Sequence, residues 1–295
     1  LIVMVESLGD GSLNWAMSQP WIDIVSNSWG PVYAGASVGS VTSSYNATQR
    51  GQSVLFSSGN GNRNTNSSEV WDPVQNATGV KDPCKCKVPN SNLSFLSHNK
   101  GPSWILTVGA ASPINGQSHW WHGIPVDVSS FGSKWRAAHA FGVARDQNRD
   151  FGGTSCASPT TGGVLAAIIE RAREALGDTV GGQRSGARVA VAAPGVTPPS
   201  TGPLADGALT RLEAEEILQK TAMPVPFDAE KATWDYAIYP TTPTYYTYQG
   251  YGIVDRGAKA RALRVLMGES AMPDRAEVDR WMAASDAARD TIWRP

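Results

Sequence analysis

The sequence predicts an α/β protein, a three-layer sandwich built on a largely parallel sheet. Apolar runs without polar alternation, at 1–5, 54–56 and 104–110, are typical of strands that are covered on both faces. Segments with helical spacing of apolar residues, such as 209–221, lie between and after them. Strands that alternate with helices along a chain favour a parallel sheet, because each helix carries the chain back to the same edge.

Composition limits the classes of function. The chain has 295 residues, 41% hydrophobic and 17% charged, which is enough to bury a large core. Its net charge of −1 gives no reason to expect nucleic acid or a membrane as a partner, and no apolar run approaches a membrane span. Three cysteines cannot build a disulfide framework. Cys84 and Cys86 could clip a loop, contribute to a metal site or be plain thiols, and Cys156 is expected to pack on a helix.

The first part of the chain is expected to form short elements in alternation. They are a strand at 1–5, a turn at 9–12 with Ser12 as cap of a helix to about 19, a strand at 21–30, a helix at 43–52 and a strand from 54. A domain rarely opens on a buried strand, so we expect an upstream segment to have been removed or lost. The segment 62–101 is a long polar loop insertion, and loops of this length are usually functional or partly disordered.

The second part of the chain continues the pattern. Strands are expected at 104–110 and 126–131, a Pro/Gly/Ala-rich connection at 186–207, an amphipathic helix at 209–221, and a strand near 253 followed by an Ala-rich helix to 267. Thr210 with Glu213 three residues later is the pattern of a capping box at the start of the helix at 209–221.

The stretch 151–169, FGGTSCASPTTGGVLAAII, carries the strongest chemical signal. Two glycines lead into Ser155, Pro159 follows early in a helix, and an apolar face begins at Val164. A hydroxyl at a helix N-terminus lies where free N–H groups and the helix dipole favour a developing negative charge. This is a suitable place for a nucleophile whose intermediate carries an oxyanion. The plainer interpretation is a Gly/Ser-rich turn that opens a buried helix.

Residues 153–159, GTSCASP, resemble the GTSxASP nucleophile motif of the subtilisin-like serine peptidases (subtilases). The resemblance implies a subtilisin-like fold with Ser155 as nucleophile. The segment that ends in Gly59-Asn60 resembles the family's (A/S)AGNxG motif, which implies that the Asn60 side chain donates to the oxyanion and that Gly59 leaves room for substrate. An ordinary Asn-Gly turn is the alternative for Asn60.

Other segments resemble the family's substrate-binding edges. Ser28, Trp29 and Gly30 match the Ser-Leu-Gly end of a family strand that borders the substrate pocket, and the turn with Gly11 and Ser12 resembles the opposite edge less specifically. Ordinary strand-end turns are the alternative for both. The resemblance extends to about residue 268, so we expect a catalytic domain at 1–268, incomplete at its N-terminus, and a helix and tail at 269–295.

No Asp-Thr-Gly or His-Gly-Thr motif is present, although a serine nucleophile needs a base. We expect His119 and His122 to be surface or packing residues. Three interpretations therefore stay open. The chain is the C-terminal part of an active serine endopeptidase whose Asp and His lie on an upstream segment or separate chain; it is a pseudo-protease that binds a peptide or partner; or it is a sedolisin-like serine-carboxyl peptidase. Asn60 argues against the last, since sedolisins usually have Asp at that position.

We favour the first interpretation, which makes a peptide or protein the substrate and leaves the isolated chain inactive. The motifs require no cofactor, and no metal-binding residue is assigned. Because family members often bind calcium, the resemblance implies calcium as an optional ligand, but no acidic ligand set stands out. An extracellular location is implied by the resemblance alone.

Overall fold

The structure is a computed structural model that describes residues 10–28, 38–58, 104–111, 126–132, 135–138, 147–181, 185–223 and 250–271, with single positions at 273, 276, 280 and 283. Its elements in chain order are α1 (Asp10–Ser18), β1 (Ile24–Asn27), α2 (Val38–Gln49), β2 (Ser53–Ser57), β3 (Leu106–Ala111), β4 (Val128–Phe131), β5 (Trp135–Ala138), β6 (Gln147–Phe151), α5 (Thr154–Leu176), the 3-10 turn η1 (Ser185–Ala187), β7 (Arg188–Val191), β8 (Ala208–Thr210), α6 (Arg211–Thr221), β9 (Ile253–Val254) and α8 (Arg256–Leu266).

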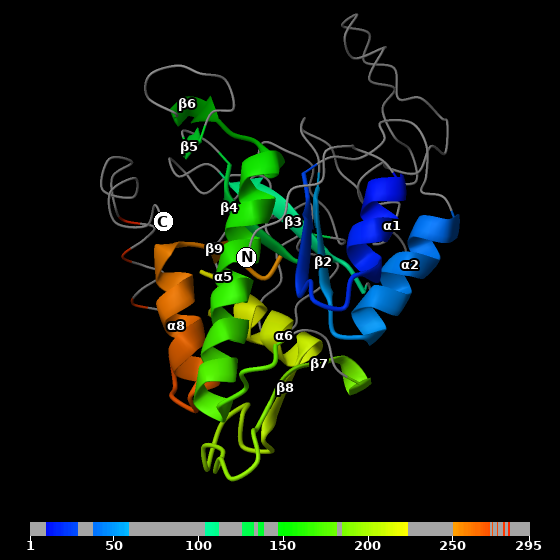
Figure 1. Ribbon diagram of the computed structural model, residues 1–295. Coiled ribbons are helices and arrows are strands. Elements are labelled where there is room, and N and C mark those ends of the chain that lie inside the picture. The colour runs from blue at the N-terminus through cyan, green and yellow to red at the C-terminus, as the bar shows by residue number, and fades with distance from the viewer. Residues whose placement is uncertain are drawn as a thin grey trace, which may run out of the picture.

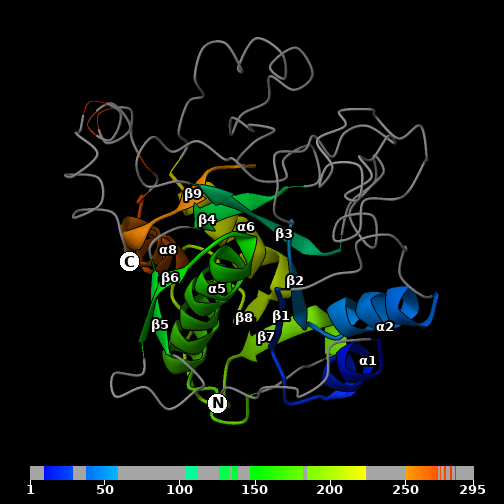
Figure 2. The ribbon, with the colours of Figure 1, turned by 90° about the horizontal axis from the view of Figure 1, so that it is seen from above.

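A five-stranded sheet in the order β1-β2-β3-β4-β9 forms the middle layer, and all four strand pairs in it are parallel. The helices α5, α6 and α8 cover one face, and α1 and α2 lie side by side on the other (Figure 1 and Figure 2). This confirms the predicted three-layer α/β sandwich with a largely parallel sheet. Every residue of β2 and β3 is buried, which explains why the sequences of these two strands show no polar alternation.

Two hydrophobic clusters lie on opposite faces of the sheet. The larger joins Leu55, Val108 and Val128 of the strands to α5, α6 and α8, and the smaller joins Val54 and Phe56 to α1 and α2. The apolar face of α5 supplies Leu165, Ile168, Ile169 and Leu176, all of which are buried. The long helix α5 is therefore the central support of the larger cluster, and its placement fixes Ser155 at its start.

Side-chain caps mark the starts of two helices. Thr210 and Glu213 form the predicted capping box of α6, and the Asp255 side chain accepts the Ala258 N–H to cap α8. Ser12 is not a cap, because α1 begins at Asp10 and contains both Gly11 and Ser12. The turn predicted at 9–12 is thus the first turn of a helix from position 10 onward, and position 9 lies outside the described residues.

Two short antiparallel pairs were not predicted. The strands β5 and β6 pair with each other beside the sandwich. The strand β7 lies within the stretch predicted as a connection and pairs with β8, which follows that stretch and includes the first two residues of the helix predicted at 209–221. In the described part of the chain, no helix is both long and apolar enough to cross a membrane.

Candidate active site at the start of α5

The backbone around Gly153 sets the direction in which α5 begins. Gly153 is the N-cap residue with φ 76° and ψ −173°, a conformation that favours glycine, and it offers no side-chain cap. Its N–H donates to the Gly132 carbonyl at the end of β4, and a Cβ at Gly132 would lie 3.0 Å from the Gly153 oxygen. The close approach of these two glycines fixes the turn that precedes Ser155.

Ser155 is the second residue of α5 and is partly exposed to solvent. Its position confirms the prediction that the serine falls at the start of a helix. Backbone N–H groups in the first turn of a helix have no helical acceptors, and together with the helix dipole they favour an anion at this point. The next residue, Cys156, points into the protein and is buried, as predicted.

Ser155 and Ser28 are joined by two hydrogen bonds that run in opposite directions. The Ser155 hydroxyl donates to the Ser28 carbonyl oxygen at 3.1 Å, and the Ser28 hydroxyl donates to the Ser155 carbonyl oxygen at 2.9 Å. The two residues are 127 positions apart in the sequence. The structure thus brings together two residues that the sequence assigned to one site, one at the C-terminal end of β1 and one at the start of α5.

The hydroxyl of Ser155 is held in this arrangement but not activated. A carbonyl oxygen accepts a hydrogen bond but does not take up the proton, whereas a nucleophilic serine must give its proton to a base. Attack by Ser155 therefore requires a base that competes with the Ser28 carbonyl for the same proton. All four histidines of the chain lie outside the described residues.

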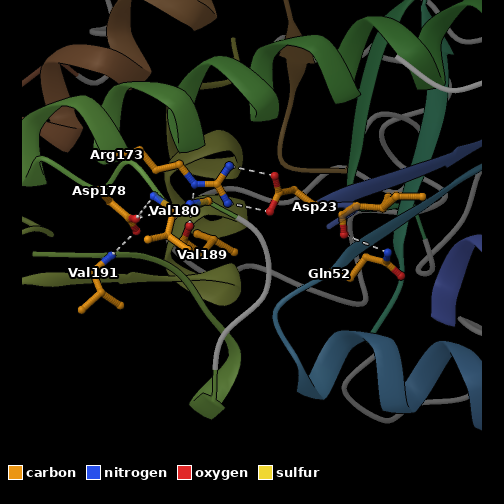
Figure 3. A network of polar contacts seen from close by, with 9 residues as sticks. Asp23, Gln52, Arg173, Asp178, Val180, Val189 and Val191 are labelled. Atoms are coloured by element: carbon orange, nitrogen blue, oxygen red, sulfur yellow. Dashed lines mark hydrogen bonds and ion pairs between the residues drawn. The ribbon is translucent and has the colours of Figure 1, made fainter. Parts of the chain in front are cut away.

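Contacts along β1 keep α5 in place beyond the serine pair. The Ser26 and Ser158 hydroxyls are hydrogen-bonded at 3.0 Å, one turn further along the helix. Near the other end of α5, the Arg173 guanidinium makes bonds of 2.8 and 2.6 Å to the two oxygens of Asp23, which precedes β1 (Figure 3). The helix that carries Ser155 is therefore bonded to both ends of one strand.

Arg173 also connects α5 to the β7–β8 pair. Its Nε donates to the Val189 carbonyl at 2.9 Å, while the Asp178 carboxylate accepts the N–H groups of Val180 and Val191 (Figure 3). This network spans the C-terminal end of α5 and lies at the opposite end of the helix from Ser155. Its role is to anchor the helix rather than to take part in chemistry.

Of the other predicted site residues, Gly11 and Ser12 lie in the described part of the chain. Trp29, Gly30, Gly59 and Asn60 lie outside the described residues, as do Cys84, Cys86, His119 and His122. Gly11 and Ser12 are described and lie in the first turn of α1. Nothing tests whether they contact a substrate, so that assignment stays a prediction.

The effects of two features of α5 outside the site itself were not recognised from the sequence. The Ser26–Ser158 contact joins elements that are distant in sequence, and no local pattern predicts it. Pro159 carries a usable signal, because a proline four residues after Ser155 cannot donate to the Ser155 carbonyl and leaves it open to another donor.

Neither a reactive thiol nor a metal cluster is found near Ser155 in the described part of the chain. Burial raises the pKa of the Cys156 thiol to about 12, so this cysteine is not a nucleophile near neutral pH. Within the described ranges, no three His, Cys, Asp or Glu side chains are grouped so that they could hold a metal ion. Whether the protein binds calcium, which the family resemblance implied only as an optional ligand, is not tested by this finding.

Comparison with known proteins agrees with the motifs. A family model described as "Subtilase family" matches residues 7–197, which include the serine pair. No curated protein matches the chain significantly. Similar solved structures include one described as proteases from Pseudoalteromonas arctica, with 18% identity over 86% of this chain and 57% of that chain and a TM-score of 0.45. Another, described as "Crystal Structure of a Lanthipeptide Protease", has 15% identity over 86% of this chain and 64% of that chain, with a TM-score of 0.48. The chain thus spans less than two thirds of either structure.

Proposed function

Because the chain belongs to the subtilase family of peptidases, we propose that it is the part of a serine endopeptidase that carries the nucleophile Ser155 and the oxyanion donor Asn60. The observation that carries the proposal is the Ser155 hydroxyl itself. It lies at a helix N-terminus on a partly exposed residue, and it is oriented by donating a hydrogen bond to a carbonyl outside its helix. These conditions favour a nucleophile in acyl transfer once a base is supplied.

The proposed reaction has two acyl-transfer steps. The Ser155 oxygen attacks the peptide carbonyl and its proton passes to a base, which then protonates the leaving amine as the peptide bond breaks. The Asn60 side chain and the Ser155 N–H stabilise the oxyanion of the tetrahedral intermediate. Water, deprotonated by the same base, attacks the ester on Ser155 and releases the acid. In this proposal the substrate backbone adds as a strand beside Ser28, Trp29 and Gly30, as in other peptide complexes.

Chain connectivity supports the role of Asn60. Asn27, next to Ser28, is paired with Phe56 of the neighbouring strand β2. Asn60 follows Phe56 by four residues, which can span at most about 14 Å. This span is compatible with the proposed role of Asn60 beside Ser155.

The base and its carboxylate are proposed to come from outside residues 1–295. The sequence has no Asp-Thr-Gly or His-Gly-Thr motif, and the Ser155 proton is shared with a carbonyl rather than a base. On this proposal the isolated chain is a poor peptidase, and the complete gene product or a separate chain restores activity.

The missing Asp and His motifs and the hydrogen bond from Ser155 to a carbonyl also favour a second candidate. This candidate is a pseudo-protease that binds a peptide without turnover. The two candidates differ in whether Ser155 ever becomes nucleophilic. A binding module has no need of both a solvent-reaching serine and an oxyanion donor, which is why we prefer the enzyme.

A fluorophosphonate probe tests the proposal, since it reacts only with activated serines. We expect labelling of the complete gene product at Ser155, little labelling of residues 1–295, and none of Ser155→Ala. Asn60→Ala should reduce peptide hydrolysis by about 10²–10³-fold, a loss established for the equivalent donor in subtilisin. Absence of labelling in the complete gene product, together with measurable peptide binding, would favour the pseudo-protease.

A further inference from the structure

Pro159 leaves a gap in the hydrogen bonding of α5. In an α-helix the carbonyl of residue i accepts the N–H of residue i+4, and Pro159 stands four residues after Ser155. Because proline has no N–H, the helix cannot supply the usual donor to the Ser155 carbonyl. The carbonyl of the candidate nucleophile is therefore open to a donor from another element.

Ser28 supplies that donor from the end of β1. Its hydroxyl lies 2.9 Å from the Ser155 carbonyl oxygen, within the normal range of a hydrogen bond. The Ser28 carbonyl in turn accepts the Ser155 hydroxyl at 3.1 Å. One residue thus holds both the backbone and the side chain of Ser155.

We propose that Ser28 is the positioning residue of the nucleophile: its hydroxyl replaces the N–H that Pro159 lacks and so fixes the orientation of Ser155. The inference rests on the proposed function in that it takes Ser155 to be the nucleophile. The two bonds have different fates during the reaction. A base must displace the Ser28 carbonyl from the Ser155 hydroxyl, whereas the bond from the Ser28 hydroxyl can persist and keep the helix start in place.

A double-mutant cycle between Ser28 and Pro159 tests this directly. Ser28→Ala removes the replacement donor, and Pro159→Ala returns a backbone N–H to the helix. In the complete gene product, we expect Ser28→Ala to lower the folding equilibrium constant about five-fold, the effect of one hydrogen bond. Labelling of Ser155 by the fluorophosphonate should slow at least about ten-fold, because small misplacements of a reacting group are costly.

The effects of Ser28→Ala and Pro159→Ala on stability and on labelling rate should not be additive. In the Pro159→Ala background the helix again has a donor for the Ser155 carbonyl, so most of both losses caused by Ser28→Ala should disappear. Ser28→Thr keeps a hydroxyl and should stay within about two-fold of the parent in labelling rate, as expected when the hydrogen bond is retained.

Ser26→Ala is the matched control, since Ser26 bonds to Ser158 of the same helix but not to Ser155. It should affect stability without slowing labelling of Ser155, and Pro159→Ala should not suppress its effect. Equal losses from Ser28→Ala with and without Pro159→Ala would overturn the proposal, as would slowed labelling in Ser26→Ala.

The outcome also separates this inference from the proposed function. If the parent protein is not labelled but the two substitutions are coupled in unfolding, the proposed function fails and the role of Ser28 in holding Ser155 stands. If the parent is labelled and no coupling is found, the peptidase stands and the positioning role fails.

Discussion

Replacement of Arg173 by alanine should weaken the attachment of α5 to β1 and lower the stability of the whole domain. The guanidinium donates hydrogen bonds of 2.8 and 2.6 Å to the Asp23 carboxylate and of 2.9 Å to the Val189 carbonyl. It therefore joins the C-terminal part of the helix to the start of a sheet strand and to a separate β pair. Removing it also leaves the Asp23 carboxylate without this counter-charge.

The size of the effect follows from exposure and geometry. Hydrogen bonds to charged groups contribute about 1.5–3 kcal/mol each when they are well buried. The Arg173 and Asp23 side chains are 18% and 22% exposed, so water replaces part of what is lost. We expect Arg173→Ala to reduce the free energy of unfolding by about 2–3 kcal/mol in total.

Arg171 provides a matched control on the same helix. It pairs with Glu174 at 3.1 Å, but the two side chains are 45% and 58% exposed. Exposed pairs of this kind contribute little, so Arg171→Ala should cost no more than about 0.5 kcal/mol.

Urea unfolding followed by tryptophan fluorescence measures both variants. A cycle with Asp23→Asn then isolates the interaction between Arg173 and Asp23, which should be at least about 1 kcal/mol. If Arg173→Ala were no more destabilising than Arg171→Ala, the claim that this network anchors α5 would be wrong.

Three further predictions concern other parts of the fold. Burial of the Asp127 carboxyl raises its pKa to about 8 from 3.8, although the residue as a whole keeps partial exposure. The folded state then keeps a proton that the unfolded state releases, so stability should fall as pH rises from about 4 to about 8, and Asp127→Asn should flatten this slope in urea unfolding. Gly132→Ala should cost about 1–3 kcal/mol in the same assay, because its Cβ would lie 2.5 Å from the Ala110 Cβ; Gly163→Ala, which meets no atom within 4 Å, should be neutral or stabilising. Cys156 should escape alkylation by iodoacetamide at about pH 8 in the folded protein and react in urea, as peptide mass mapping can show, because burial raises its pKa to about 12.

The sequence was most informative where a local pattern determines local structure. The capping box at Thr210 and the glycine-led start of α5 depend on residues within one or two turns, and both were predicted. The strands β2 and β3 were found because burial on both faces leaves a continuous apolar run in the sequence. Boundaries were less accurate: the strand predicted at 21–30 is Ile24–Asn27, and the helix predicted at 43–52 is Val38–Gln49.

What the sequence did not predict depends on contacts between distant segments. The strand β7 lies within a Pro/Gly-rich stretch, where pairing with β8 rather than residue preference decides the structure. The hydrogen bonds between Ser28 and Ser155 join positions 127 apart, and only the family resemblance placed the two residues in one site. The predicted partner Asn60 lies outside the described residues, so its convergence with Ser155 stays a prediction.

The central claim is that Ser155 becomes a nucleophile once a base is supplied from outside this chain. Mass spectrometry of fluorophosphonate adducts on the complete gene product measures this directly, with residues 1–295 alone as the comparison. The account predicts a single adduct on the peptide that contains Ser155 in the complete product, and little or none in the isolated chain. A complete product that carries no adduct there, or an isolated chain that reacts as fast, would contradict it.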